Sequence, residues 1–261
     1  PAHVQHIASY TAHIGPATCC DAMGELVASG GEDGRLLVYQ WAQDALRPLR
    51  EYGTLVDITT HALRFDTPNT FIAAASTTKV CRYDVRVHGT QPVTRFAQPD
   101  VPAMPECPIF SLDVHPSAPH LILSATGARG GKQGMGGMLL LHDSRTSGTT
   151  PLSPVAEGHT AHGVSLHRSH VWAARFYTPA PHRVISAGAD GIIGHWTLPS
   201  LPSAPTYSQH SSLPTARGNA TVRALHQSAL GITDIAISNA GDYLLAATQA
   251  ESLVAIQLSS S

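Results

Sequence analysis

The chain has 261 residues, a formal net charge of −2, a charged fraction of only 13% and 43% hydrophobic residues. This length and hydrophobic content suit one large all-β domain, or two ordinary domains, with a buried core. Only Lys79 and Lys132 are lysines among the sixteen basic residues, so no basic stripe is available for a phosphate backbone. That composition argues against a nucleic-acid partner.

Four cysteines, Cys19, Cys20, Cys81 and Cys107, contain no CxxC pair and predict neither a zinc site nor a disulfide framework. We therefore expect a reducing compartment. The longest apolar runs, FIAAA and MLLL, are strand-sized, whereas a membrane helix needs about 20 residues, so we expect no membrane insertion. No secretory signal is visible and the chain begins at Pro1, which leads us to expect a piece of a longer protein.

Five segments repeat one pattern: a β-rich run ending in small residues, a tight polar turn, and a second β-rich run. They are 26–41, 71–86, 121–145, 183–198 and 243–258. The second run ends in an aromatic residue or His in the first four copies, and we place Gln257 in that slot in the fifth. The four residues are Tyr39, Tyr83, His142 and Trp196. Each copy is predicted to be a β-hairpin.

A third strand precedes most hairpins, clearest in 109–116, 171–179 and 232–238, where apolar residues recur at every second position. Segments that follow the hairpins, such as 46–53 and 149–157, are predicted as outer fourth strands, because their prolines suit a sheet edge. Four-stranded units in tandem predict an all-β fold, a β-propeller, as a single domain over 1–261. The predicted blades cover roughly 14–52, 58–100, 107–157, 165–205 and 226–261, with a Pro- and Ser-rich inter-blade loop at 198–219.

The repeat resembles that of the WD-repeat family. Two hairpins end in sequences similar to its Trp-Asp-x-Arg signature with the Trp replaced, and their key residues are Tyr83, Asp84, Arg86, His142, Asp143 and Arg145. The turns GEDG (31–34) and GADG (188–191) resemble its inter-strand turn. The fourth copy fills all four slots of the family's hydrogen-bonded tetrad, with His167, Ser186, Asp190 and Trp196. The resemblance implies that these residues hold one blade together and perform no chemistry.

Within that family the most similar members are the WD-repeat nucleoporins of the Y-shaped complex in the nuclear pore scaffold. The similarity rests on 31–41, 111–127, 138–148, 171–196 and 229–256. It implies a seven-bladed propeller from which roughly two N-terminal blades are missing in this chain. It also implies a non-enzymatic scaffold subunit at the nuclear envelope, without cofactor or metal, in a large hetero-oligomer. The implied partners are other Y-complex nucleoporins, chiefly a helical-solenoid nucleoporin of the short arm.

Two motifs could suggest other chemistry. The stretch GARGGKQGMGG (127–137) has the composition of a phosphate-binding loop, but Lys132 is followed by Gln133 and a strand, not by Ser or Thr and a helix. By register it is predicted to be an enlarged turn between the second and third strands of a blade, on the same face as the segment 158–170. That segment carries His159, His162, His167 and His170, a spacing that could bind a transition metal, yet only Glu157 stands nearby as an acid. We expect a structural or solvated role for these histidines.

Two rival functions remain open. A WD-repeat substrate receptor or chromatin adaptor would read a peptide at the propeller channel and would need an exposed aromatic or acidic pocket at its mouth. A propeller enzyme would need convergent catalytic groups on the channel-facing strands. Those strands supply only scattered polar residues, Asp113, His115, Arg175 and Asp234, so we predict no catalytic residues.

Overall fold

The computed structural model describes residues 12–43, 45–53, 58–75, 79–96, 107–128, 136–145, 148–151, 166–198 and 221–258. These ranges form antiparallel β-sheets, as the alternation of buried and less buried residues along strands such as 171–176 requires. Within the part of the chain that the structure describes, no helix is long and apolar enough to span a membrane.

Five sheets follow one another along the described chain, and in each sheet the strands pair in chain order. Sheet 1 contains β1 (Ala17–Met23), β2 (Leu26–Gly31), β3 (Leu36–Ala42) and β4 (Ala45–Tyr52). Sheet 2 contains β5 (Thr60–Thr67), β6 (Thr70–Ala75), β7 (Val80–Asp84) and β8 (Thr94–Arg95). Sheet 3 contains β9 (Ile109–Val114), β10 (Leu121–Thr126), β11 (Leu139–Asp143) and β12 (Gly148–Pro151). Sheet 4 contains β13 (Val171–Phe176), β14 (Arg183–Gly188), β15 (Ile192–Thr197) and β16 (Thr221–Gln227). Sheet 5 has three strands, β17 (Ile232–Ile237), β18 (Tyr243–Thr248) and β19 (Leu253–Gln257).

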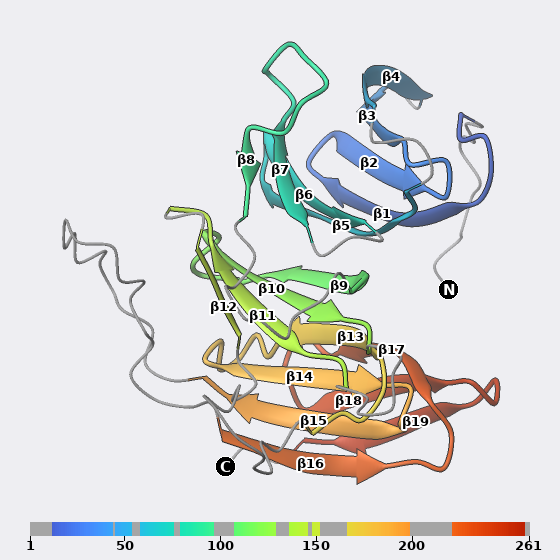
Figure 1. The fold of residues 1–261 in the computed structure, drawn as a ribbon, viewed down its shortest axis with the longest axis vertical. Helices are drawn as coiled ribbons and strands as arrows, with labels where there is room; N and C mark the ends of the chain where they lie inside the picture. Colours follow the sequence, from blue (N-terminus) through green and yellow to red (C-terminus); the bar gives the residue numbers. More distant parts are fainter. Residues whose placement is uncertain are drawn as a thin grey trace.

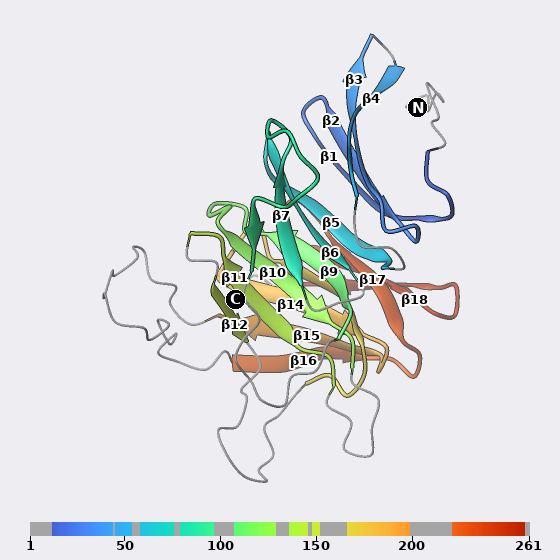
Figure 2. The same cartoon turned by 45° about the horizontal axis from the view of Figure 1, so that its top comes forward.

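The sheets are arranged as an arc around their first strands. β1 contacts β5, β5 contacts β9, β9 contacts β13, and β13 contacts β17. Figure 1 shows these five strands gathered on the inner side, with β4, β8, β12 and β16 on the outside; the tilted view in Figure 2 shows the same succession of sheets. An all-β chain of four-stranded antiparallel sheets packed in this way is consistent with a β-propeller.

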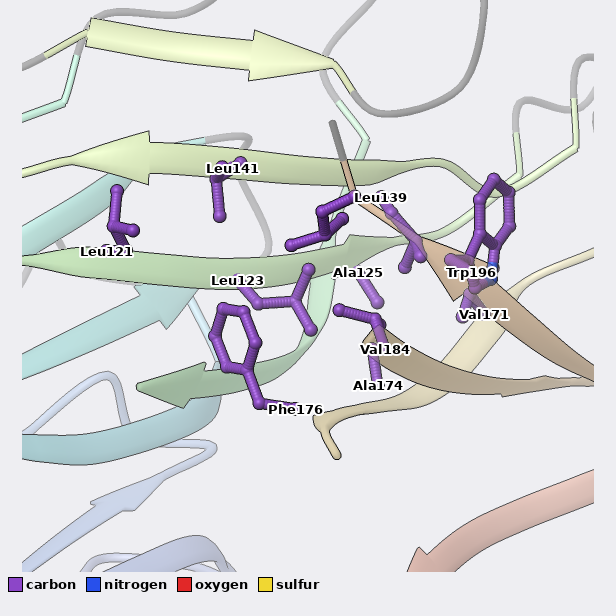
Figure 3. Close-up of a cluster of buried hydrophobic side chains, with 11 residues drawn as sticks. Leu121, Leu123, Ala125, Leu139, Leu141, Val171, Ala174, Phe176, Val184 and Trp196 are labelled. Carbon is purple, nitrogen blue, oxygen red and sulfur yellow. The ribbon is translucent and has the colours of Figure 1, made fainter. Parts of the chain in front are cut away.

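Hydrophobic side chains between consecutive sheets form the core, so that each pair of neighbouring sheets shares a buried apolar interface. Between sheets 3 and 4, Leu123 and Leu139 pack against Val184 and Trp196 (Figure 3). Every one of these side chains is at most 1% exposed. The face of a sheet that carries Trp196, or its equivalent, therefore packs on the preceding sheet, and the opposite face packs on the next.

The first strands of sheets 1 to 4, which form the inner side of the arc, each carry a charged residue at the same register position, and the sign of the charge alternates from sheet to sheet. Asp21, Arg64, Asp113 and Arg175 each pair with the third residue of the second strand in their own sheet. Asp21 accepts a hydrogen bond from the main-chain N–H of Phe65 at 2.8 Å and lies 3.2 Å from Arg64. These contacts join sheet 1 to sheet 2.

The same contact recurs two sheets further on, where Asp113 accepts a hydrogen bond from the main-chain N–H of Phe176 at 2.7 Å. Arg175 donates to Ser111 Oγ at 2.7 Å and lies 3.3 Å from Asp234 in sheet 5. Burial raises the pKa of Asp113, although the bond from Phe176 and the charge of Arg175 act in the opposite direction. A guanidinium has no acceptor atom, so Arg64 cannot make the corresponding bond to sheet 3.

Replacing Asp113 with alanine is expected to lower the free energy of unfolding by about 1–3 kcal/mol, because the Phe176 N–H loses its acceptor in a buried place. Urea denaturation followed by circular dichroism measures this change. Asp234→Ala is the matched control, since its side chain is 66% exposed and pairs with the same Arg175. The control should lower the free energy of unfolding by less than about 1 kcal/mol. Equal losses in the two variants would contradict the stabilising role given to the Asp113–Phe176 hydrogen bond.

Two predictions from the sequence are wrong. The fourth sheet does not end near residue 205, because β16 pairs with β15 beyond the segment 198–219. That segment therefore connects two strands of one sheet and is not an inter-blade loop; residues 199–220 themselves lie outside the described ranges. In sheet 5, Ile256 pairs with Leu244 as Trp196 pairs with Val184, so Ile256, not Gln257, holds the aromatic slot.

Candidate functional site

The four predicted tetrad residues of sheet 4 come together in one hydrogen-bonded chain. The Trp196 indole N–H donates to Ser186 Oγ at 2.7 Å, and Ser186 Oγ lies 2.7 Å from His167 Nε2. His167 Nδ1 lies 3.1 Å from Asp190 Oδ1. Since the carboxylate can only accept, Nδ1 carries the proton and Nε2 accepts the Ser186 hydroxyl. His167 and Trp196 are each 1% exposed, so the network stabilises the sheet and has no access to a substrate.

The carboxylate at the end of this chain also organises the turn before β15. Asp190 accepts hydrogen bonds from the main-chain N–H groups of Arg168 at 2.8 Å and Ile192 at 3.1 Å. Burial alone would raise the pKa of Asp190, but the bonds from His167 and these N–H groups hold it below its ordinary range. The turn residue Gly191 takes a φ of +74°, in the region that favours glycine.

Sheet 1 contains a second network of this kind, which the sequence analysis did not identify. His13 lies 2.8 Å from Ser29 Oγ through Nε2 and 3.0 Å from Asp33 Oδ1 through Nδ1. Asp33 accepts hydrogen bonds from the N–H groups of Ile14 and Arg35, as Asp190 does from its own neighbours. The signal was present in the spacing, because His13 precedes β1 by four residues just as His167 precedes β13.

The predicted Asp-x-Arg endings close the third strands of sheets 2 and 3. Arg86 binds Asp84 through two nitrogens at 3.0 and 2.7 Å, and Arg145 binds Asp143 at the same two distances. Tyr83 is stacked on Phe71, with ring centroids 5.2 Å apart. His142 is buried, with Nε2 2.7 Å from Ser124 Oγ, so it takes the place that Trp196 has beside Ser186.

The Gly-rich stretch connects β10 to β11, as predicted, and Gly127, Ala128, Gly136 and Gly137 are its described residues within 127–137. Both ends contact the segment that precedes β13. Ala128 N–H donates to His170 Nδ1 at 2.9 Å, and Gly137 N–H donates to the carbonyl oxygen of Ser169 at 2.7 Å. The prediction that the two motifs share a face is confirmed at these ends.

Of the four clustered histidines, His167 and His170 lie in the described ranges, while His159 and His162 lie outside them. His167 belongs to the tetrad, and His170 accepts a hydrogen bond from Ala128. In the described part of the chain, no group of three or more His, Cys, Asp or Glu side chains could hold a metal ion.

A row of aromatic side chains lies at one end of the inner strands, and the sequence analysis missed it. Each of the five first strands has a register shift at its second residue, and such bulges redirect a side chain. In sheets 2 to 4 these residues are His61, Phe110 and Trp172, whose half-buried rings form a continuous row. Phe110 lies 5.1 Å from His61 and 4.4 Å from Trp172 between centroids, and His170 lies 5.2 Å from Trp172. The row crosses three sheets beside the Gly-rich turn.

Stacked four-stranded antiparallel sheets with buried His–Ser–Asp networks are consistent with a β-propeller. A family model described as "WD domain, G-beta repeat" matches residues 4–40, which include His13, Ser29 and Asp33. This match supports the WD-repeat family, whose members are in general interaction scaffolds and not enzymes.

Among solved structures, the chain is similar to the crystal structure of the computationally designed Ika8 protein, with a TM-score of 0.62 and 15% identity. The similarity covers 94% of this chain and 59% of the designed protein, so this chain spans little more than half the length of that one. At such low identity the likeness concerns the fold alone. No curated protein matches the sequence.

Proposed function

We propose that this protein is a non-enzymatic scaffold subunit of the nuclear pore, in the outer-ring Y complex, where it supports pore assembly and nucleocytoplasmic transport. Its partners on this proposal are other Y-complex nucleoporins, chiefly a helical-solenoid nucleoporin of the short arm. The similarity of 31–41, 111–127 and 229–256 to WD-repeat nucleoporins supports the identity of the complex. We further propose a complete propeller of seven blades, to which this chain contributes five.

The uncovered face of sheet 5 supports the proposal of a larger propeller, because a further blade would cover it as sheet 5 covers sheet 4. In sheet 4, the equivalent face is covered by sheet 5, and Ile185 and Ile193 are 0% exposed. The matching residues of sheet 5, Leu245 and Leu253, are 46% and 72% exposed. Tyr243 on the same face is 50% exposed. An apolar sheet face of this kind is stable in water only when another surface covers it.

Purification of the tagged full-length protein from native nuclei tests the proposed complex. We expect Y-complex nucleoporins to co-purify with it, and the tagged protein to be concentrated at the nuclear rim. Absence from Y-complex fractions, or an even distribution through the cytoplasm, would remove the assignment to the pore.

The aromatic row favours a second candidate function, a substrate receptor or chromatin adaptor that reads a peptide at the channel. The rings of Phe110 and Trp172 are half-buried, so each keeps an accessible aromatic edge. Aromatic rings are common anchors for peptides. On this alternative, Phe110→Ala and Trp172→Ala should each abolish capture from a peptide library, while Trp41→Ala should leave it unchanged.

A further inference from the structure

The outer rim of sheets 1 and 2 exposes a second group of apolar side chains, far along the arc from sheet 5. Leu49 lies on β4, and Val87 and Val93 lie in the connection between β7 and β8. Their exposed fractions are 45%, 47% and 46%, which places them among the most exposed large hydrophobic residues of the described ranges.

Hydrogen bonds join these elements into one surface. Arg50 Nε on β4 donates to the carbonyl oxygen of Val85 at 2.5 Å, and the Tyr52 hydroxyl donates to the carbonyl oxygen of Asp84 at 3.1 Å. Arg50 Nη1 lies 3.5 Å from His88 Nδ1. The position of the β7–β8 turn against β4 is therefore fixed by the fold.

Arginines without acidic partners border the same surface. Arg47 donates to Gln43 Oε1 at 2.8 Å, and Arg95 donates to Gln91 Oε1 at 3.0 Å. The acids nearest to them along β4 and β7 are already bound, Glu51 by Arg35 and Asp84 by Arg86. In the described part of the chain, Arg47, Arg50 and Arg95 thus keep their charge uncompensated, although the whole chain has a net charge of −2.

The backbone of β4 restricts how a partner can dock. Pro48 provides no N–H, and the register shift between Val38 and Tyr39 places a bulge at Leu49. A partner strand cannot extend the sheet along such an edge, so side chains must make the contact. Aliphatic groups surrounded by arginines complement a surface with apolar residues along its middle and carboxylates at its sides, which is the surface of an acidic amphipathic helix.

We infer that the rim patch, Arg47, Leu49, Arg50, Val87, Val93 and Arg95, binds an acidic amphipathic helix of a partner protein. This inference deepens the proposed scaffold function, because it names the chemistry of one partner surface. A nucleic acid is the less suitable ligand, since the rim patch has no aromatic ring on which a base could stack.

Fluorescence anisotropy with a defined probe tests the rim patch on the purified full chain. The probe is a labelled helical peptide of about 20 residues with Leu at helical spacing and Glu on both sides of that stripe. The double variants Val87→Ser/Val93→Ser and Arg47→Glu/Arg95→Glu should each weaken binding about tenfold or more. Leu230→Ser and Arg223→Glu, at exposed positions outside the rim patch, are matched controls and should stay within about twofold of the unchanged protein. Circular dichroism verifies that all variants are folded.

Two results of the anisotropy experiment would contradict the inference. Equal binding of a scrambled peptide, or unchanged binding in either double variant, would overturn it. Binding of poly-uridine that is lost in the arginine variant and kept in the valine variant would show a nucleic-acid surface instead. The Y-complex purification separates this inference from the proposed function: normal co-purification of both rim variants would overturn the role of the patch and leave the pore assignment standing.

Discussion

Replacing Trp196 with alanine is expected to lower the free energy of unfolding by about 3–5 kcal/mol, a large part of the stability of an ordinary domain. The side chain is 1% exposed and lies in the core between sheets 3 and 4 (Figure 3), so its removal leaves a cavity lined by Leu139 and Val171. The indole N–H also supplies Ser186 with a hydrogen bond. Urea denaturation followed by circular dichroism measures the loss.

Two control variants separate the contributions of volume and hydrogen bonding. Trp196→Phe keeps most of the apolar volume and removes the donor to Ser186, so it should cost about 1–2 kcal/mol. Trp41→Ala removes the same side chain from a half-buried position at the end of β3 and should cost less than about 2 kcal/mol. Equal losses in Trp196→Ala and Trp41→Ala would contradict the importance given to the tetrad.

Acidification is expected to destabilise the protein through His142. Burial lowers the pKa of this imidazole from 6.5 to about 3 in the folded chain. Above pH 6.5 both the folded and the unfolded states hold it neutral, and the stability is complete. Below pH 6.5 the unfolded state binds the proton first, so the free energy of unfolding falls by about 1.4 kcal/mol per pH unit towards pH 3. Between pH 7 and pH 5 this residue alone should lower the free energy of unfolding by about 2 kcal/mol.

The variant His142→Trp tests the cause, because it introduces the residue that occupies this slot in sheet 4 beside Ser186. Its unfolding free energy should depend less on pH by about 1 kcal/mol per unit between pH 6.5 and 5. His182→Gln changes an exposed imidazole, and we expect it to keep the dependence of the unchanged protein. If the unfolding free energy of the unchanged protein, His142→Trp and His182→Gln depended on pH to the same extent, the assignment to His142 would be contradicted.

The hairpins and the tetrad could be predicted because local sequence determines them. Alternating apolar residues, the turn GADG and the fixed spacing of His167, Ser186, Asp190 and Trp196 all lie within about thirty residues of each other. The fourth strand of sheet 4 could not be predicted in the same way, since its partner strand β15 ends 24 residues before it. Ile256 could not be distinguished from Gln257 as the holder of the aromatic slot in sheet 5. The strand that pairs with it, YLLAAT, has apolar residues at consecutive positions, so the sequence does not show which of them face the core. A shift of one residue exchanges the two faces of a strand.

The aromatic row and the charged level of the inner strands needed the structure for a different reason. Both consist of single residues spaced by forty or more positions, and only the stacking of sheets makes them neighbours. The aromatic residues share the second position of their strands, and the charged residues share a position near the middle. These shared positions can be recognised only when the strand registers of the sheets are compared. His13, in contrast, needed no structure, because the four-residue spacing from a first strand was already known from His167.

The alternation of Asp and Arg on the inner strands has a mechanical consequence. Only the aspartates accept a main-chain N–H from the next sheet, so this bond links sheet 1 to sheet 2 and sheet 3 to sheet 4. The junctions between sheets 2 and 3 and between sheets 4 and 5 carry an arginine at this level and lack the bond. A chain stretched from its two ends in an optical trap should therefore yield first at these two junctions. The length increments should then correspond to sheets 1 and 2 together, sheets 3 and 4 together, and sheet 5 alone, and Asp21→Ala should divide the first of these steps into two shorter ones.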